Sequence, residues 1–160
     1  MKRGTTHFLK MAVILIGIPI LAFCIFTVPR FGNFAGELYP EMAYMKSLVL
    51  VDMYAAAIPF YFALYQAFKL LSYIDKNQAF SALSVKALKN INYCAITIST
   101  LYLIGMPLYY LIQERVDPPG IMAIGLVIIF SSLVIAVFAS VLQRLLQEAI
   151  NIKSENDLTV

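Results

Sequence analysis

Two polar side chains, Asp52 and Gln66, interrupt the apolar stretch of residues 47–70 and are the first candidates for chemistry. If this stretch spans a bilayer, an aspartate near the middle costs about 2.5–3.5 kcal/mol, and less near the interface. As a functional site, Asp52 would bind a proton or a ligand in a cavity, with Gln66 on the same helix face. As a structural residue, it would pair with a base or accept a tyrosine hydroxyl; the expected partners are Arg30, Lys46, Tyr102 and Tyr109.

The other reactive residues do not form a recognisable catalytic or metal centre. Cys24 and Cys94 are the two cysteines, too few and too far apart for a disulfide framework or a redox pair. The single histidine, His7, precedes the first apolar run, so neither haem ligation between helices nor a zinc site is expected. No GxGxxG, Walker, HExxH or GxSxG pattern is present. The sequence therefore predicts no enzyme, no cofactor and no metal.

The composition is that of a membrane protein. Of the 160 residues, 61% are hydrophobic and 13% are charged, and the mean hydropathy is +0.82. Soluble domains carry about 25% charged residues, so this chain could not cover a soluble surface. The net charge of +3 is not gathered on a dense basic face with aromatic residues beside it. Direct binding of nucleic acid is therefore not expected.

Four apolar runs are long enough to cross the hydrocarbon core, which takes about 20 helical residues. The predicted fold is an all-α, four-helix transmembrane bundle that forms one membrane domain over residues 1–160. The chain start resembles a secretory signal peptide, but no small-x-small cleavage site follows the first run, which favours an uncleaved helix. The predicted spans are residues 11–28, 47–70, 93–113 and 121–142, with an outer loop at 29–46, a cytoplasmic hinge at 69–92 and a cytoplasmic extension at 143–160.

The basic residues indicate how these spans are oriented. The hinge holds four lysines against the single acid Asp75, and short loops rich in Lys and Arg stay on the cytoplasmic side. Both termini are therefore predicted to be cytoplasmic in a multi-pass protein of the cell membrane. Contact with anionic lipid headgroups is expected on this side, because each Lys or Arg near the surface contributes about 1 kcal/mol.

Within the hinge, residues 80–91 have the pattern of an amphipathic helix, with Ser81 as its cap. This helix would lie at headgroup level with its apolar side chains toward the lipid. Alternatively, it would serve as a docking platform for a cytosolic protein. The candidate residues for contact with the partner or the lipid are Lys76, Lys86 and Lys89.

Small residues at four-residue spacing predict where the helices pack, since membrane helices associate through close backbone approach. One ridge lies in the second span and another in the fourth. Burial against neighbouring helices of the same chain and assembly of a homodimer both fit this pattern. The ridges consist of Ala55, Pro59, Ala63 and Ala67, and of Ser132, Ala136 and Ser140.

A family resemblance is centred on residues 62–89, which read FALYQAFKLLSYIDKNQAFSALSVKALK. This stretch resembles the YoaS-like bacterial membrane proteins of domain-of-unknown-function family 2975, and the resemblance extends over nearly the whole chain. It implies a four-helix membrane protein of a Gram-positive-type bacterium, often encoded beside a small helix-turn-helix regulator. The family supplies no catalytic residues.

We therefore expect an integral membrane protein that acts by interaction, as the membrane partner of a cytosolic helix-turn-helix regulator. The hinge helix and the extended fourth helix would hold that regulator. The alternative, suggested by Asp52 and Gln66, is a small transporter or immunity-type protein that binds a peptide, a lipid or an ion within the bundle. A water-accessible cavity that reaches Asp52 would favour the alternative, and tight packing around Asp52 would favour interaction.

Overall fold

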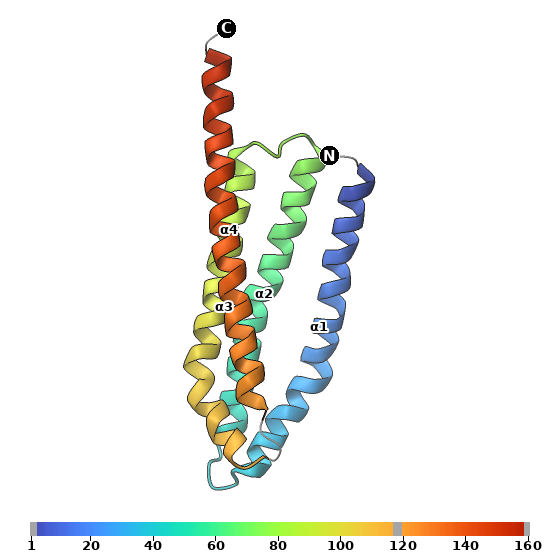
Figure 1. Cartoon of the computed structure of the whole chain (residues 1–160). Helices are drawn as coiled ribbons and strands as arrows, with labels where there is room; N and C mark the ends of the chain where they lie inside the picture. Colours follow the sequence, from blue (N-terminus) through green and yellow to red (C-terminus); the bar gives the residue numbers. More distant parts are fainter. Residues whose placement is uncertain (1–2, 117–119, 159–160) are drawn as a thin grey trace.

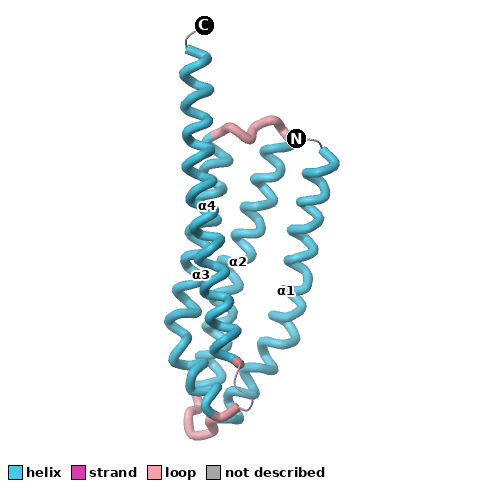
Figure 2. Tube along the Cα trace, in the orientation of Figure 1, coloured by secondary structure: helices cyan, strands magenta, loops and turns pink. Residues whose placement is uncertain are grey.

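The computed structural model describes residues 3–116 and 120–158, and within these ranges the chain forms four α-helices and no strand (Figure 1, Figure 2). Each helix is long and apolar enough to cross a membrane. Each predicted span lies inside one helix, so the prediction of an all-α, four-helix protein is confirmed. The helices are α1 (Arg3–Leu38), α2 (Met45–Asp75), α3 (Ala82–Glu114) and α4 (Ile121–Leu158).

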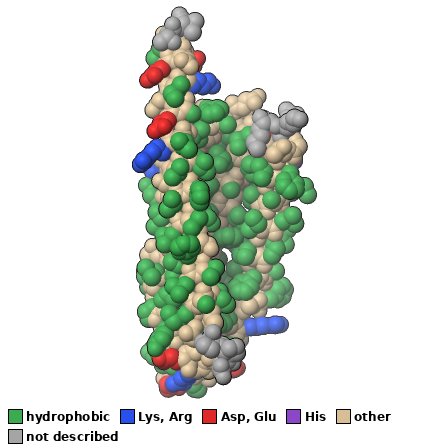
Figure 3. Space-filling model, in the orientation of Figure 1, with side chains coloured by type: hydrophobic (Ala, Val, Ile, Leu, Met, Phe, Trp, Pro, Cys, Tyr) green, Lys and Arg blue, Asp and Glu red, His purple; other side chains and the backbone are tan. Residues whose placement is uncertain are grey.

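The helices pack in chain order, α1 on α2, α2 on α3 and α3 on α4. Helix α1 begins and α4 ends at the same end of the molecule, where α1 diverges from the bundle and α4 projects beyond its neighbours (Figure 1). Charged side chains gather at the two ends in Figure 3, and hydrophobic side chains cover the surface between them. This distribution suits a protein whose middle lies in lipid.

The predicted outer loop is shorter in the structure, because α1 continues past Val28 to Leu38. Pro29 lies inside the helix rather than at its end. A proline removes one backbone donor and bends a helix, and membrane helices tolerate this when neighbouring groups compensate. The residues that follow are packed: Ala35 is fully buried, and Phe31 and Leu38 lie against the core. Burial therefore maintains a helix where the local sequence indicated a loop.

The separate amphipathic helix predicted for residues 80–91 is not seen in the structure. Its residues from Ala82 onward are helical, but they form the first part of the continuous helix α3. No proline or glycine lies between Ala82 and Ile91, so nothing interrupts the backbone hydrogen bonds between this segment and the span that follows.

The connection between α2 and α3 is correspondingly short, because α2 continues to Asp75 and only residues 76–81 join the two helices. Asn77 has a φ of 59°, a left-handed conformation that asparagine adopts more readily than most residues. The hydroxyl of Ser81 donates to the carbonyl of Gln78 at 2.6 Å. Ser81 thus stabilises the connection; it occupies the N-cap position of α3, as predicted, but its side chain makes no capping hydrogen bond.

The predicted extension after residue 142 is helical as far as Leu158. The polar segment from Ser154 also continues α4 through the described residues. No proline or glycine occurs after Gly125, so the sequence contains no strong helix stop in this region.

The main buried cluster lies at the end opposite to the start of α1. It consists of Ala35, Tyr39, Met45, Val49, Tyr109 and Ile112. Arg115 closes this end: its guanidinium donates to the Leu38 carbonyl at 2.5 Å and to the Glu41 carboxylate at 2.8 Å. Its Cζ lies 3.7 Å from the centre of the Tyr39 ring. The last carbonyls of a helix lack intrahelical donors, so Arg115 supplies one to α1; we call these four residues the Arg115 clasp.

Candidate functional site

Asp52 lies at the contact between α2 and α3, where the hydroxyl of Tyr109 donates to its Oδ2 at 2.5 Å. Tyr109 is almost fully buried, and its ring is stacked on that of Tyr102 with 6.2 Å between the ring centres. Gly105 lies one turn before Tyr109, and a Cβ at this position would be 2.7 Å from Asp52 Oδ2. The close approach of α2 and α3 at Asp52 therefore depends on the absence of a side chain at residue 105.

Among the predicted partners of Asp52, Tyr109 is the one that the structure places at hydrogen-bond distance. Neither Arg30 nor Lys46 lies within ion-pair distance of the carboxylate in the part of the chain that the structure describes. Gln66 is buried as well, but it lies roughly 21 Å farther along α2 at 1.5 Å per residue. Asp52 and Gln66 thus do not form one site.

A cavity of about 580 Å³, here called the central crevice, lies between the helices, and all four of them line it. Its wall on α2 consists largely of small side chains, including Ala63 and Ala67 of the predicted ridge. These two residues therefore face open space instead of a packed neighbour. Figure 3 shows the surface hollowed between α4 and α1. The lining is predominantly apolar, and Asp52 does not contribute to it.

Helix α1 is attached to α2 rather than to α4. Tyr54 and Tyr61 of α2 each donate a hydrogen bond to a backbone carbonyl of α1 at 2.8 Å. Near the start of α1, Lys10 pairs with Asp75 at 2.8 Å, and both side chains are less than one-fifth exposed. Because α1 makes few contacts with α4, the central crevice remains open between them.

The cysteines and the histidine stay apart in the fold. Cys24 lines the central crevice, Cys94 is buried in α3, and both thiols are free. Among the residues that the structure describes, no group of three or more His, Cys, Asp or Glu side chains could hold a metal ion.

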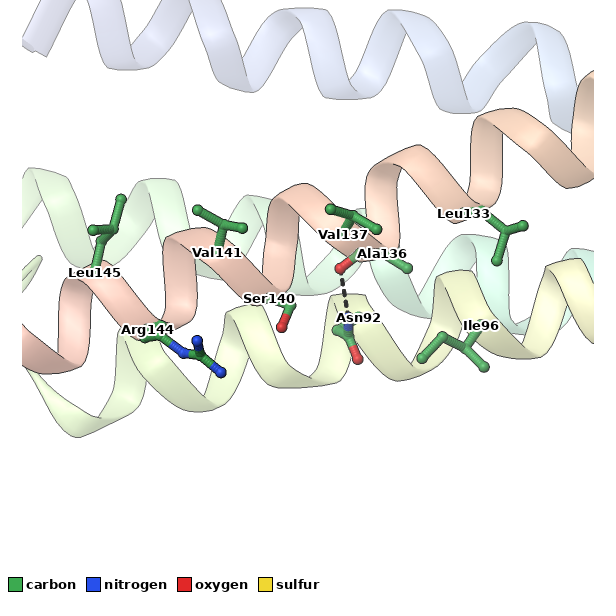
Figure 4. Close-up of a pocket in the computed structure, with 9 residues that line it drawn as sticks. All are labelled: Asn92, Ile96, Leu133, Ala136, Val137, Ser140, Val141, Arg144 and Leu145. Carbon is green, nitrogen blue, oxygen red and sulfur yellow. Dashed lines mark hydrogen bonds between the residues drawn. The ribbon is translucent and has the colours of Figure 1, made fainter.

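A second hollow of about 570 Å³, the α3–α4 groove, runs along the surface of these two helices (Figure 4). Within it, Asn92 of α3 donates to the Ala136 carbonyl of α4 at 2.5 Å. Ala136 and Ser132 are buried, as predicted for their ridge, whereas Ser140 is exposed. Arg144 lies toward one end of the groove, beyond Ser140 (Figure 4). The groove is thus apolar along most of its length and carries a positive charge at one end.

Residues 30–160 match the protein-family model described as "Protein of unknown function (DUF2975)". The chain belongs to this family. It is similar to the "Uncharacterized membrane protein YoaS" of Bacillus subtilis (strain 168), with 69% identity over 160 residues and 100% of both chains covered. No solved structure matches. The description of this relative and the four apolar helices agree, so the chain is a multi-pass membrane protein.

The three lysines predicted to contact a partner or lipid are all exposed. Lys76 lies in the connection between α2 and α3, and Lys86 and Lys89 lie in the first turns of α3. The ammonium of Lys89 is 5.8 Å from the centre of the Tyr93 ring. All three therefore lie near the end at which α4 projects (Figure 1).

Arg115 and Asn92 are among the side chains whose interhelical contacts the sequence patterns did not indicate. Arg115 has the sequence context of an ordinary interfacial base, and only the fold brings it to Leu38. Asn92 lies within the stretch predicted as hinge. Once α3 is known to start at Ala82, an asparagine between apolar turns becomes a recognisable signal, because such side chains commonly bond across membrane helices.

Proposed function

We propose that the chain acts by interaction rather than catalysis, as the membrane partner of a cytosolic helix-turn-helix regulator. The projection of α4 is the observation that supports this proposal most directly. Val85, in the first turn of α3, lines a hollow together with Gln147 and Glu148 of α4. Beyond these residues α4 continues alone to Leu158 (Figure 1). This part is about 15 Å long at 1.5 Å per residue and offers a surface to a soluble protein.

The charges at the projecting end support the same proposal. The exposed Lys76, Lys86 and Lys89 lie near the base of the projection, and the distribution of Lys and Arg along the chain favours a cytoplasmic location for this end. A cytoplasmic position of both termini is part of the proposal. The lysines would contact an acidic surface of the regulator, or anionic headgroups where the regulator is absent.

The surroundings of Asp52 favour interaction over ion transport. Its carboxylate accepts a hydrogen bond from the buried Tyr109 and lies against Gly105. The central crevice does not reach it. A carboxylate that joins two helices and lies outside the crevice is better suited to packing than to carrying protons or ions.

The proposal can be tested by expressing the tagged chain together with a helix-turn-helix regulator of the kind that the family resemblance implies, and by purifying the chain from solubilised membranes. Wild-type protein should retain the regulator, and removal of residues 149–160 should release it. Replacement of Lys76, Lys86 and Lys89 by glutamine should weaken retention. Arg30→Gln, which removes an exposed base from the last third of α1, is the control and should have no effect. Failure of the wild type to retain the regulator, or equal retention by the truncated chain, would contradict the proposal.

The central crevice supports a second candidate function, the binding of a lipid within the bundle. Its volume of about 580 Å³ lies within the range of small-molecule sites, about 300–1,000 Å³. The apolar lining suits a lipid chain better than a peptide or an ion. Ala63→Trp should fill the crevice and abolish the co-purification of lipid observed by native mass spectrometry. Ala123→Trp, at an exposed position of α4, is the matched control. Equal lipid retention by both variants would exclude the crevice as the site.

A further inference from the structure

An exposed apolar seam runs along the last part of α4 and continues onto the projection. Leu142, Leu145, Ala149 and Ile152 alternate at spacings of three and four residues, as the a and d positions of a coiled-coil heptad do. Leu145 is 57% exposed and Ile152 is 60% exposed. We call these four residues the α4 seam. Ala149 and Ile152 belong to the projection, and an exposed apolar stripe on a protein surface marks an interaction site.

The α4 seam faces away from the bundle to which α4 belongs. The packed face of α4 carries the buried residues Ser132, Ala136 and Ala139. With 3.6 residues per turn, the seam lies roughly 140° around the helix from that face. Figure 1 shows the end of α4 standing clear of α2 and α3. The other helices of the same chain therefore leave the seam uncovered.

We propose that two copies of the chain pair through a parallel coiled coil along the α4 seam. Copies inserted in one membrane with the same orientation project their α4 helices in the same direction, which makes the pairing parallel. Isolated helices shorter than about 12–15 residues are only marginally stable in water. Pairing buries Leu145 and Ile152 and stabilises the projection as a two-stranded structure.

The charges beside the seam fit a second copy in this register. With Leu142 and Ala149 at a positions, Glu148 occupies a g position and Lys153 the e position of the next heptad. In a parallel coiled coil such g and e residues face each other across the seam, so Glu148 of each copy lies opposite Lys153 of the other. The ion pairs found among the described residues involve neither side chain. Asn156 occupies the next a position, where a single asparagine specifies register and oligomeric state.

The same charges make a lipid surface a poor occupant of the seam. Glu148 and Glu155 both lie at g positions along its edge and outnumber Lys153 at the e position, so the edge as a whole would repel anionic headgroups. A second copy instead places a lysine opposite Glu148. The observations therefore favour a copy of the chain over the membrane surface.

Disulfide crosslinking in membranes tests the seam directly. In a background with Cys24 and Cys94 replaced by alanine, Leu145→Cys and Ile152→Cys should each form a crosslinked dimer on mild oxidation. Disulfides require Cα atoms within about 7 Å of each other. A crosslink therefore shows that the seam residues of two copies face each other. Gln147→Cys and Ser154→Cys, at exposed f positions on the opposite face, are the controls and should remain monomeric. Absence of dimer at the seam, or equal crosslinking at the f positions, would overturn the proposal.

Charge reversal tests the register in the purified full-length chain. Glu148→Lys or Lys153→Glu replaces two attractions in the dimer by two repulsions, and each should weaken dimerisation on the order of tenfold. The double variant Glu148→Lys/Lys153→Glu restores opposite charges and should regain wild-type dimerisation. Single reversals without effect, or a double variant as weak as the singles, would refute this register. Both experiments use the chain without any regulator, so their failure would leave the proposed regulator partnership standing.

Discussion

The hydrogen bond between Tyr109 and Asp52 joins α2 and α3. It gives the carboxylate a hydrogen-bond donor in surroundings that are otherwise apolar. Interhelical hydrogen bonds in membranes contribute about 0.6 kcal/mol on average. Placing an aspartate in the hydrocarbon costs several times as much. The contact therefore offsets part of the cost of Asp52 and sets the register of the two helices, and it does not by itself hold them together.

We expect Asp52→Asn to change the free energy of unfolding by no more than about 1 kcal/mol, because the amide keeps the shape and one acceptor for Tyr109. Asp52→Leu should cost more, about 1–3 kcal/mol, because the buried hydroxyl loses its acceptor. Thermal unfolding in detergent measures both changes. Adding Tyr109→Phe to Asp52→Leu should recover part of the loss. A large loss of folded protein with Asp52→Asn would instead indicate that an ionic contact holds the charge.

Gly105→Ala tests the close approach of α2 and α3. The added methyl group would lie 2.7 Å from Asp52 Oδ2, and overpacking of this kind typically costs about 1–3 kcal/mol. The loss should shrink when Asp52 is also shortened to alanine. Gly4→Ala is the control, because nothing lies within 4 Å of its Cβ position and alanine favours the helix. The two glycine variants should therefore shift the unfolding temperature in opposite directions, and equal shifts would argue against a close contact at residue 105.

Among the elements, the connection between α1 and α2 and the end of α3 form one unit through the Arg115 clasp. The guanidinium offers several donors in a fixed plane, so it bonds a helix-terminal carbonyl and a carboxylate while it lies against an aromatic ring. Lysine cannot make this combination of contacts. The clasp and the buried cluster hold the helices together at this end, whereas α1 and α4 lie apart at the other (Figure 1).

Arg115→Lys should therefore destabilise the protein nearly as much as Arg115→Gln, which distinguishes a geometric role from a role of charge alone. The pKa of the Glu41 carboxyl is lowered by a hydrogen bond from its own backbone and by Arg115. With Arg115→Gln we expect this pKa to rise toward its ordinary value. A carboxyl whose pKa is lower in the folded protein than in the unfolded chain stabilises the fold at pH values above the unfolded pKa. This stabilisation is lost as the pH falls through the folded pKa. Titration of Glu41 by NMR in micelles would measure the shift, with Arg30→Gln as the control.

On the scale of the whole molecule, the helices form a row that is closed at one end and open at the other. The tyrosine hydrogen bonds and the Lys10–Asp75 pair hold α1 to α2, and the central crevice separates α1 from α4. The projection of α4 lies at the open end. The crevice thus lies in the middle of the bundle, and the surface offered to a protein lies at one end.

The orientation in the membrane can be measured with single cysteines in a background without Cys24 and Cys94. Lys76→Cys and Ser154→Cys, both exposed at the projecting end, should be shielded from membrane-impermeant thiol reagents in intact cells. Ala43→Cys, exposed in the connection between α1 and α2, should be labelled. Labelling of residue 76 in sealed cells would reverse the orientation and remove the basis for a cytosolic partner.

Much of the fold follows from the sequence, because the length of an apolar run and the thickness of a bilayer are local quantities. Four runs predict four spans, and each predicted span lies within one of the helices. The burial of Ser132 and Ala136 was likewise predictable from their spacing. Tyr109 could be named among the partners of Asp52 because depth in the membrane can be counted along each helix.

The tertiary structure alone decided where the helices end and which faces meet. Packing of Ala35 and Phe31 keeps α1 helical past Pro29, although the local signals of proline and glycine favoured a loop. Ala63 and Ala67 line an open crevice although their spacing predicted a packed ridge. A small side chain permits close approach but does not bring a neighbour to it. Which neighbour arrives depends on contacts between distant residues, such as Arg115 with Leu38, and these are not encoded in any local pattern.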